Sequence, residues 1–333
     1  MQIIVFGAGA VGSTIGGLLA LNRNEVVLVG RKDHVREISA QEGLRMRSGT
    51  GEYFAPLTAV ESDPPVSDGA CILFTPKSYS TESCLDQLKG AVPEDTPIVS
   101  LQNGVTNEEM IADHFPNVFG GVCKMTCSFL HPGRVTFRKI GRIVIGKYPK
   151  GADPFARKLV QLFEDAGLTS TASRSIMCDK WLKLVTNLQS TFNAIVEIRD
   201  HESIEFMKLK VGIIEEARRV LKADKIRAKS CDGRDQSFEE MIRSLQKPRA
   251  QRSTGSLRVN NSTWQNLYLK RSRIENEYFH QPVIDLGASH GIPVPFNQVA
   301  LEKVMKSHEE QLGPESFRAA DILEEIQKRI EKQ

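Results

Sequence analysis

The sequence predicts an α/β fold, with an N-terminal Rossmann-type, doubly wound parallel sheet followed by an all-helical C-terminal domain. Short β-branched runs alternate with helical patterns in the first half of the chain. A glycine-rich turn directly follows the first of these runs. From Ile176 onward strand patterns nearly vanish and long helical periodicities take over. We therefore expect two domains, over residues 1–173 and 174–333.

Several short apolar runs are typical of buried parallel strands, and they cover residues 3–6, 26–29, 70–74, 98–101 and 118–122. Tighter alternation at 134–138 and 143–145, with turn signals at 132–133 and 139–141, predicts an antiparallel hairpin at the sheet edge. The remaining predicted elements are a helix over 154–166, a strand over 169–172 and helices over 178–196, 204–221, 238–245, 263–290, 298–306 and 317–330.

The composition is that of an ordinary globular protein. The chain has 333 residues, 40% of them hydrophobic and 26% charged, which excludes a wholly disordered protein. Its net charge of +3 comes without a concentrated basic face, so we expect neither nucleic acid nor a membrane as partner. Its six cysteines are too sparse for a disulfide scaffold, and the first residues lack a signal-peptide pattern. Both features favour a cytoplasmic protein, and the His and Cys spacing predicts no metal site.

A G-x-G-x-x-G turn lies between the first predicted strand and a predicted helix. The turn consists of Gly7, Ala8, Gly9, Ala10, Val11 and Gly12. In such a turn the first glycine permits a tight bend, the second lets a pyrophosphate approach the backbone, and the third lets helix and strand pack closely. The pattern predicts a dinucleotide site, with a merely tight turn as the open alternative.

The residues after the second strand indicate which dinucleotide is bound. Val29 is followed by Gly30, Arg31 and Lys32, whereas an NAD site would place a carboxylate there for the ribose 2′-hydroxyl. A guanidinium suits the 2′-phosphate of NADPH through charge-assisted hydrogen bonds. Arg31 therefore favours NADPH as the cofactor, and two ordinary surface cations are the alternative.

Two further polar residues follow predicted strands. Lys77 comes after the strand at 70–74, and Asn103 comes after the strand at 98–101. Because the carboxyl ends of parallel strands share one edge of the sheet, we expect Lys77 and Asn103 near the glycine loop and Arg31. Taken singly, they are also typical of a solvated lysine and of an Asn-Gly turn.

A polar stripe runs along the helix predicted over 178–196. Lys183, Asn187 and Thr191 lie at i, i+4 and i+8 among large apolar residues, so they face either water or a wet pocket. Spacing alone makes Glu275 one carboxylate among several. The basic segment 243–258 predicts a solvated connection or a lid over an anionic cofactor. The amphipathic last helix fits core packing or a homodimer.

Taken together, these motifs resemble the ketopantoate reductase family, also called 2-dehydropantoate 2-reductase. The matching pieces follow the family's order over nearly the whole chain. They are Gly7 to Gly12, Arg31, Pro76-Lys77, Leu101-Gln102-Asn103-Gly104, Trp181-x-Lys183-Leu184-x-x-Asn187, the segment 261–266 with Ser262, Glu275, and the segment 290–295.

The resemblance implies NADPH-dependent reduction of 2-dehydropantoate to pantoate, on the route to pantothenate and coenzyme A. The expected partner is therefore a small 2-oxo acid. The family pattern implies that Lys183 is the general acid and that Asn103 and Asn187 orient Lys183, the substrate and the nicotinamide. It also implies that Glu275 binds the substrate hydroxyl and that Ser262 meets the substrate carboxylate.

This chain departs from the family pattern in the segments that would contact the substrate. Thr191, which we expect at the substrate, stands where the family commonly has a second asparagine, and His280 stands where a later asparagine is common. A reductase of a different branched 2-oxo acid is therefore an alternative. An NADPH-binding sensor without turnover is another, although the retention of Lys183 and Glu275 argues against it.

Overall fold

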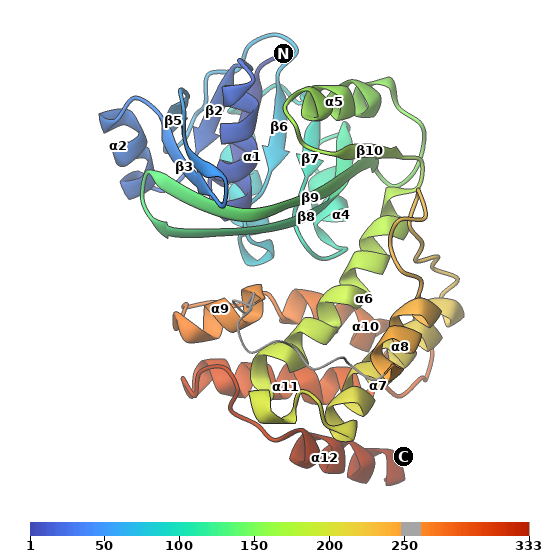
Figure 1. Cartoon of the computed structure of the whole chain (residues 1–333). Helices are drawn as coiled ribbons and strands as arrows, with labels where there is room; N and C mark the ends of the chain where they lie inside the picture. The colour runs from blue at the N-terminus through green and yellow to red at the C-terminus, as the bar shows by residue number, and fades with distance from the viewer. Residues whose placement is uncertain (248–260, 333) are drawn as a thin grey trace. The chain divides into compact units, whose positions relative to one another are not determined.

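The computed structural model describes residues 1–247 and 261–332 and divides into two compact units, Met1–Lys180 and Trp181–Gln333 (Figure 1). The division falls within the helix α6 (Ile176–Ile195), whereas the domain boundary expected from the sequence is just before this helix. The part of the basic segment 243–258 from residue 248 onward lies outside the described residues, and so does the predicted lid.

The N-terminal unit contains one sheet with helices on both faces, which confirms the predicted Rossmann-type fold (Figure 1). Its strands are β1 (Ile3–Phe6), β2 (Val26–Val29), β3 (Leu44–Ser48), β4 (Gly51–Ala55), β5 (Thr58–Val60), β6 (Cys71–Phe74), β7 (Ile98–Ser100), β8 (Val118–His131), β9 (Arg134–Lys147) and β10 (Ser170–Ser173). Their order across the sheet is β4-β3-β9-β8-β7-β6-β1-β2-β5, and β10 pairs with β9. The helices of this unit are α1 (Ala10–Leu21), α2 (Lys32–Ala40), α3 (Thr81–Leu88), α4 (Asn107–Ala112) and α5 (Pro154–Asp165), with a 3-10 turn, η1 (Ser78–Ser80).

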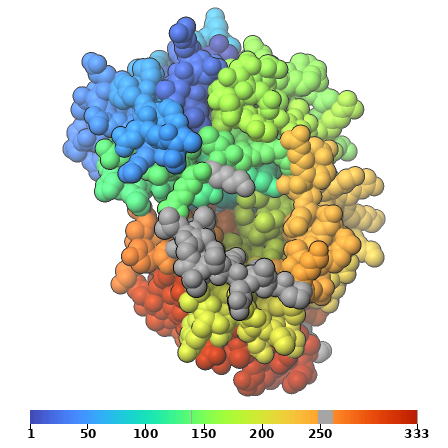
Figure 2. All heavy atoms as spheres, in the orientation of Figure 1, coloured from blue at the N-terminus to red at the C-terminus, as the bar shows by residue number. Residues whose placement is uncertain are grey.

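The pleat of the central strands explains why their sequences are apolar throughout. In β1, Ile3 and Val5 belong to the core that α1 and α5 cover, whereas Ile4 and Phe6 belong to the core that α3 and α4 cover. In Figure 2 the light-green atoms of α5 lie beside the dark-blue atoms of the first residues, consistent with one shared helical layer. A strand that is buried on both faces has no position for a polar side chain.

The parallel register brings several strand ends to one edge of the sheet. Phe6, at the end of β1, is paired with Val29 of β2 and with Phe74 of β6. The strand β6 is in turn parallel to β7, with Phe74 opposite Ser100. The segments that follow β1, β2, β6 and β7 therefore all begin at the same edge.

The antiparallel hairpin predicted around 134–145 is present, but it turns at residues 132–133 only and does not lie at the sheet edge. The strand β9 continues through residues 139–141 without a turn, and its antiparallel partner is the preceding strand β8. A register shift opposite Cys123 and Met125 accommodates the irregular stretch that the sequence suggests is a turn. The pair is also internal to the sheet, because β9 lies between β3 and β8.

The hairpin of β3 and β4 is absent from the elements that the sequence predicts. Leu44 and Met46 are buried, whereas Arg45 and Arg47 between and after them are exposed. This alternation with a period of two is a strand pattern, but it spans only four residues.

The C-terminal unit is helical, as predicted. Its elements are η2 (Ile198–Asp200), α7 (Ile204–Ala223), α8 (Phe238–Gln246), α9 (Ser262–Tyr268), α10 (Glu277–Ser289), α11 (Pro295–Glu309) and α12 (Ala319–Glu331). The helix α7 is its centre, since it packs against α8, α10, α11 and α12. The single helix predicted over 263–290 is instead divided into α9 and α10, with Lys270 at a left-handed φ of 47° between them. Among the described residues, no helix combines the length and the hydropathy needed to cross a membrane.

Candidate active site

The glycine loop between β1 and α1 is held by the ends of β2 and β6. The amides of Gly7 and Ala8 both donate to the carbonyl of Val29, at 3.0 and 2.9 Å. The hydroxyl of Thr75, directly after β6, donates to the carbonyl of Gly7 at 2.8 Å. The loop conformation therefore depends on both neighbouring parallel strands.

The three glycines of the motif differ in what surrounds them. Gly7 has a φ of +100°, and a Cβ added there would lie 2.5 Å from the backbone nitrogen of Pro76. A Cβ on Gly12 would lie 2.7 Å from the carbonyl oxygen of Gly7. A Cβ on Gly9 would meet no atom nearer than 4.0 Å. Packing within the protein thus explains why residues 7 and 12 are glycines, whereas Gly9 borders open space.

The loop fits the pyrophosphate of a dinucleotide. Gly9 is the N-cap of α1, no side chain caps the helix, and its first turn carries no acidic residue. The amides of this first turn and the positive end of the helix dipole favour an anion in the open space beside Gly9.

Arg31 lies next to this loop, after the end of β2. Arg31 is exposed and is the N-cap residue of α2. A Cβ on the preceding Gly30 would lie 2.9 Å from the Cβ of Ala8, so the chain before Arg31 packs directly against the glycine loop. This arrangement fits an adenosine 2′-phosphate near Arg31.

His34 anchors α2, the helix that Arg31 caps, and it is not among the residues predicted from the sequence. Its Nδ1 accepts from the amide of Gly133 at 2.9 Å, and its Nε2 lies 3.1 Å from the hydroxyl of Ser13 in α1. Because an amide can only donate, the proton of the neutral ring is on Nε2. Burial, and next the charge of Arg31, lower the pKa of His34 to about 4. A single histidine in a helix gives no sequence signal for these contacts.

A buried polar network fixes the turns that carry Lys77 and Asn103. The side-chain amide of Gln102 donates to the carbonyl of Pro76 at 3.0 Å. The hydroxyl of Ser78 donates to the carbonyl of Asn103 at 3.1 Å. Lys77 lies between Pro76 and Ser78, so Lys77 and Asn103 are held on adjacent turns. These bonds use the backbone carbonyl of Asn103 and not its side-chain amide.

A buried ion pair supports the same turns and was also missed. Lys180, near the start of α6, is 2% exposed and donates to the carboxylate of Glu108 in α4, which is fully buried. Lys180 also donates to the carbonyl of Gln102 at 3.2 Å. Gln102, the residue before Asn103, is therefore held by hydrogen bonds through both its side chain and its backbone carbonyl.

The polar stripe on α6 is divided between two environments. Lys183 and Asn187 are half-buried, whereas Thr191 is fully buried. The hydroxyl of Thr191 lies 2.8 Å from Nε2 of His280 and accepts from the side-chain amide of Asn276 at 2.8 Å. The side chain of Thr191 therefore lies inside the helical core, and its contact with the substrate stays a prediction.

The predicted substrate residues Ser262 and Glu275 lie on segments that are tied to α6. Ser262 is exposed at the first position of α9, and Glu275 is 4% exposed just before α10. Asn261, the N-cap of α9, donates to the carbonyl of Ser190 in α6 at 2.8 Å. The start of α9 and the end of α6 are therefore fixed to each other.

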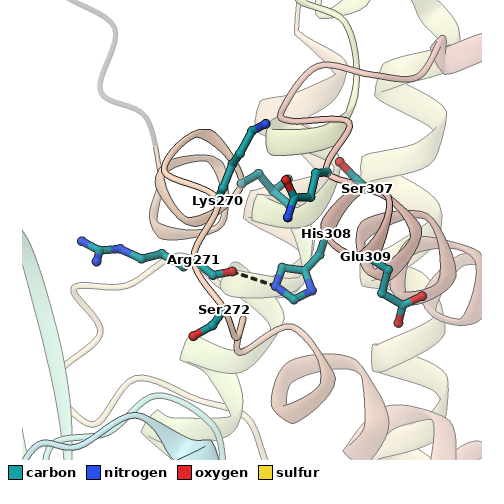
Figure 3. A pocket seen from close by; sticks show the side chains of 8 residues that line it. Lys270, Arg271, Ser272, Ser307, His308 and Glu309 are labelled. Carbon is teal, nitrogen blue, oxygen red and sulfur yellow. Dashed lines mark hydrogen bonds between the residues drawn. The ribbon is translucent and has the colours of Figure 1, made fainter.

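A cavity of about 200 Å³ lies beside the loop that joins α9 to α10 (Figure 3). In it, Nε2 of His308 donates to the carbonyl of Arg271 at 2.8 Å. None of the predicted site residues lines this cavity, whose walls are Leu267, Lys270, Arg271, Ser272, Ser307, His308, Glu309 and Gln311. The histidine bond holds the loop that leads to Glu275.

Three of the six cysteines are buried enough to raise the pKa of their thiols. Burial raises the pKa of Cys71 to about 12 and the pKa of Cys84 and Cys127 to about 11, which keeps these cysteines as thiols. Over residues 1–247 and 261–332, no group of three or more His, Cys, Asp or Glu side chains is placed to hold a metal ion.

Two family models match the chain. The model described as "Ketopantoate reductase PanE/ApbA" matches residues 3–150, and the model described as "Ketopantoate reductase PanE/ApbA C terminal" matches residues 175–308. The chain belongs to the ketopantoate reductase family. The matches cover the glycine loop, the helix that carries Lys183 and the segment that carries Glu275.

Individual relatives agree with the family assignment. A 2-dehydropantoate 2-reductase of Pyrococcus horikoshii is 35% identical over 201 residues, which are 60% of this chain and 65% of that relative, just under two thirds of its length. A ketopantoate reductase structure from Ralstonia eutropha has a TM-score of 0.79 at 25% identity, covering 94% of this chain and 100% of the other. D-mandelate dehydrogenase, solved with NADH and anilino(oxo)acetate, also has a TM-score of 0.79, at 24% identity, covering 93% of this chain and 99% of the other. At that identity the last similarity shows the fold alone.

Alanine substitutions at the first two glycines should have different effects. Gly7→Ala should lower the free energy of unfolding by about 2 kcal/mol or more, because φ and the contact with Pro76 both oppose a Cβ. Gly9→Ala should leave this free energy within about 0.5 kcal/mol and weaken nucleotide binding. Urea unfolding and fluorescence titration with NADPH measure the two effects. A large loss of stability in Gly9→Ala together with unchanged NADPH affinity would contradict this division of roles.

His34 should make the protein less stable at mildly acidic pH. Between pH 6.5 and about 4 the unfolded chain binds a proton at His34 that the folded protein does not, so the free energy of unfolding falls as the pH decreases. The full loss from this residue is roughly 3 kcal/mol. Urea unfolding at about pH 7 and about pH 5 should show a smaller decrease for His34→Gln than for the wild type. The exposed His114→Gln serves as control, and equal decreases in all three proteins would refute the assignment.

Proposed function

We propose that this protein is an NADPH-dependent reductase of a 2-keto acid, with 2-dehydropantoate as substrate and pantoate as product. Membership of the ketopantoate reductase family over both units carries the proposal. The residues to which the family resemblance assigns chemistry, Lys183 and Glu275, are both present.

The N-terminal unit would hold the cofactor. Its glycine loop offers the amides of a helix N-terminus to the pyrophosphate, and Arg31 offers an exposed guanidinium to the 2′-phosphate. Lys77 and Asn103 lie on adjacent turns at the same edge of the sheet. When bound, NADPH supplies the hydride that the carbonyl carbon of the keto acid accepts.

Lys183 would act as the general acid. An ammonium with an ordinary pKa of about 10.4 is charged at neutral pH, so it can polarise the ketone oxygen by hydrogen bonding. As negative charge develops on that oxygen, Lys183 transfers a proton to it, and the neutral amine that remains regains a proton from water. Asn187, one turn further along α6, would orient the amine and the substrate.

Glu275 and Ser262 would bind the rest of the acid. Glu275 would accept a hydrogen bond from the hydroxyl of 2-dehydropantoate, and Ser262 would donate one to its carboxylate. The near-complete burial of Glu275 supports this role, because a buried carboxylate binds a hydroxyl without competition from bulk water.

A different branched or bulky 2-oxo acid is a second candidate substrate. Thr191 and His280 replace two residues that are commonly asparagine in the family, and they lie against Asn276, next to Glu275. The substitutions therefore affect the segments assigned to the substrate and leave the cofactor residues unchanged.

A panel of 2-oxo acids tests the proposal through the consumption of NADPH absorbance. 2-Dehydropantoate should give the highest kcat/KM, and Lys183→Ala should lower kcat by about 100-fold or more with little change in NADPH affinity. Lys183→Arg should also have a low kcat, because a guanidinium keeps the positive charge but is too weak an acid to donate the proton. The matched control is Lys208→Ala, at an exposed lysine of α7. NADPH binding without consumption for every acid would support the sensor alternative and refute the proposal.

Arg31 should determine the preference between the two dinucleotides. Arg31→Ala should raise the Kd for NADPH by about 10-fold or more and leave the Kd for NADH nearly unchanged, because only NADPH has the 2′-phosphate. Arg36→Ala, at an exposed arginine of the same helix, is the control for a general loss of positive charge. Equal weakening of both nucleotides in Arg31→Ala would exclude a 2′-phosphate contact.

A further inference from the structure

A chain of polar side chains connected by hydrogen bonds runs through the helical unit, and each is at most 2% exposed. In order, its members are Thr263 of α9, Asn276 before α10, Thr191 of α6, His280 of α10, Asn297 of α11 and Glu216 of α7. The successive donor–acceptor distances are 3.3, 2.8, 2.8, 3.1 and 2.9 Å. Five helices of the unit, or the residues that begin them, are thus linked by one buried network.

The carboxylate of Glu216 sets the direction of the hydrogen bonds. It accepts from the backbone amides of Phe296 and Asn297 at 2.8 and 2.9 Å, and from the side-chain amide of Asn297 at 2.9 Å. Because the amide nitrogen of Asn297 faces Glu216, its amide oxygen faces Nδ1 of His280. Burial raises the pKa of Glu216 to about 7, so the carboxylate form prevails above that pH.

His280 transmits this direction to the other end of the chain. Burial lowers its pKa to about 4, so the ring is neutral and carries one proton. That proton is on Nδ1, which donates to Asn297, and Nε2 therefore accepts from the hydroxyl of Thr191. Thr191 in turn accepts from Asn276, and Asn276 accepts from the hydroxyl of Thr263. Every donor in the chain points toward Glu216.

The end of the hydrogen-bonded network that is far from Glu216 reaches the segments assigned to the substrate. Thr263 directly follows Ser262, and Asn276 directly follows Glu275. Thr191 lies one helical turn after Asn187 on α6. Each of these three network residues therefore fixes the backbone beside a residue that would contact the 2-oxo acid.

We propose that Thr191 and His280 are positioning residues, which hold the segments of Asn187, Ser262 and Glu275 in the arrangement that binds the 2-oxo acid without touching it. The inference rests on the proposed function and identifies the residues that set the geometry of its substrate site. The hydroxyl of Thr191 in α6 lies 2.8 Å from Nε2 of His280 in α10, so the two side chains bond directly across the two helices. The two residues are therefore coupled and act as one unit.

Two substitutions at Thr191 test the role of its hydroxyl. Thr191→Val removes the hydroxyl at constant volume and leaves Asn276 and His280 without their partner, whereas Thr191→Ser keeps the hydroxyl. Thr191→Val should lower kcat/KM for the 2-oxo acid by about 10- to 100-fold with an unchanged Kd for NADPH, and Thr191→Ser should stay within about threefold of the wild type. An equal decrease in both variants, or no decrease in Thr191→Val, would overturn the proposal.

A second set of variants keeps the proposal testable if Thr191→Val does not fold. Thr191→Asn and His280→Asn should each lower kcat/KM by about 10-fold, and the double variant should recover most of the loss, because the two positions interact directly. Additive losses in the double variant would refute the coupling.

Nitrogen NMR of the histidine rings tests the chain without any substrate. At about pH 8, His280 of the wild type should be neutral with its proton on Nδ1. A proton on Nε2 would overturn the directed chain even if turnover is normal. If the wild type reduces no 2-oxo acid, the proposed function fails, and the substrate role of Thr191 and His280 fails with it. The NMR result still decides whether the directed hydrogen-bonded network exists.

Discussion

The in-register parallel pairing of β1 with β2 and β6 is the constraint on which the rest of the N-terminal unit depends. Because Phe6 is level with both Val29 and Phe74, the segments after these three strands start at one edge of the sheet. The glycine loop therefore lies between the segment that carries Arg31 and the segment that carries Lys77. A shift of one residue in any of these strands would exchange its two buried faces, so the register is strongly specified by the two cores.

Buried polar groups provide the second level of organisation in both units. In the N-terminal unit, Lys180, Glu108 and Gln102 are buried and hold the turn before Asn103. In the helical unit, the chain from Glu216 to Thr263 connects the segments of Ser262 and Glu275. Buried polar groups are costly unless they are paired, so each network favours one arrangement of its loops over the alternatives.

The local motifs were readable from the sequence because their conformational requirements are local. Gly7 needs a positive φ, and a run such as 3–6 needs burial on both faces. By contrast, the division of 263–290 into two helices depends on Lys270 adopting a left-handed conformation, which no residue type there announces. The period-two pattern of Leu44 and Met46 was present but too short to stand out.

The sequence by itself determined the fold class, the glycine loop and the residues at the strand ends, because strand burial and turn chemistry are set by residues close together in the chain. Only the tertiary structure decided that the side chain of Thr191 is buried. By spacing Thr191 continues the stripe of Lys183 and Asn187, but it packs against His280 and Asn276. The same holds for His34, Lys180 and Glu108, whose partners lie far away in the sequence. Helical spacing fixes which side chains share a face, whereas packing against other helices decides whether that face meets water or the core.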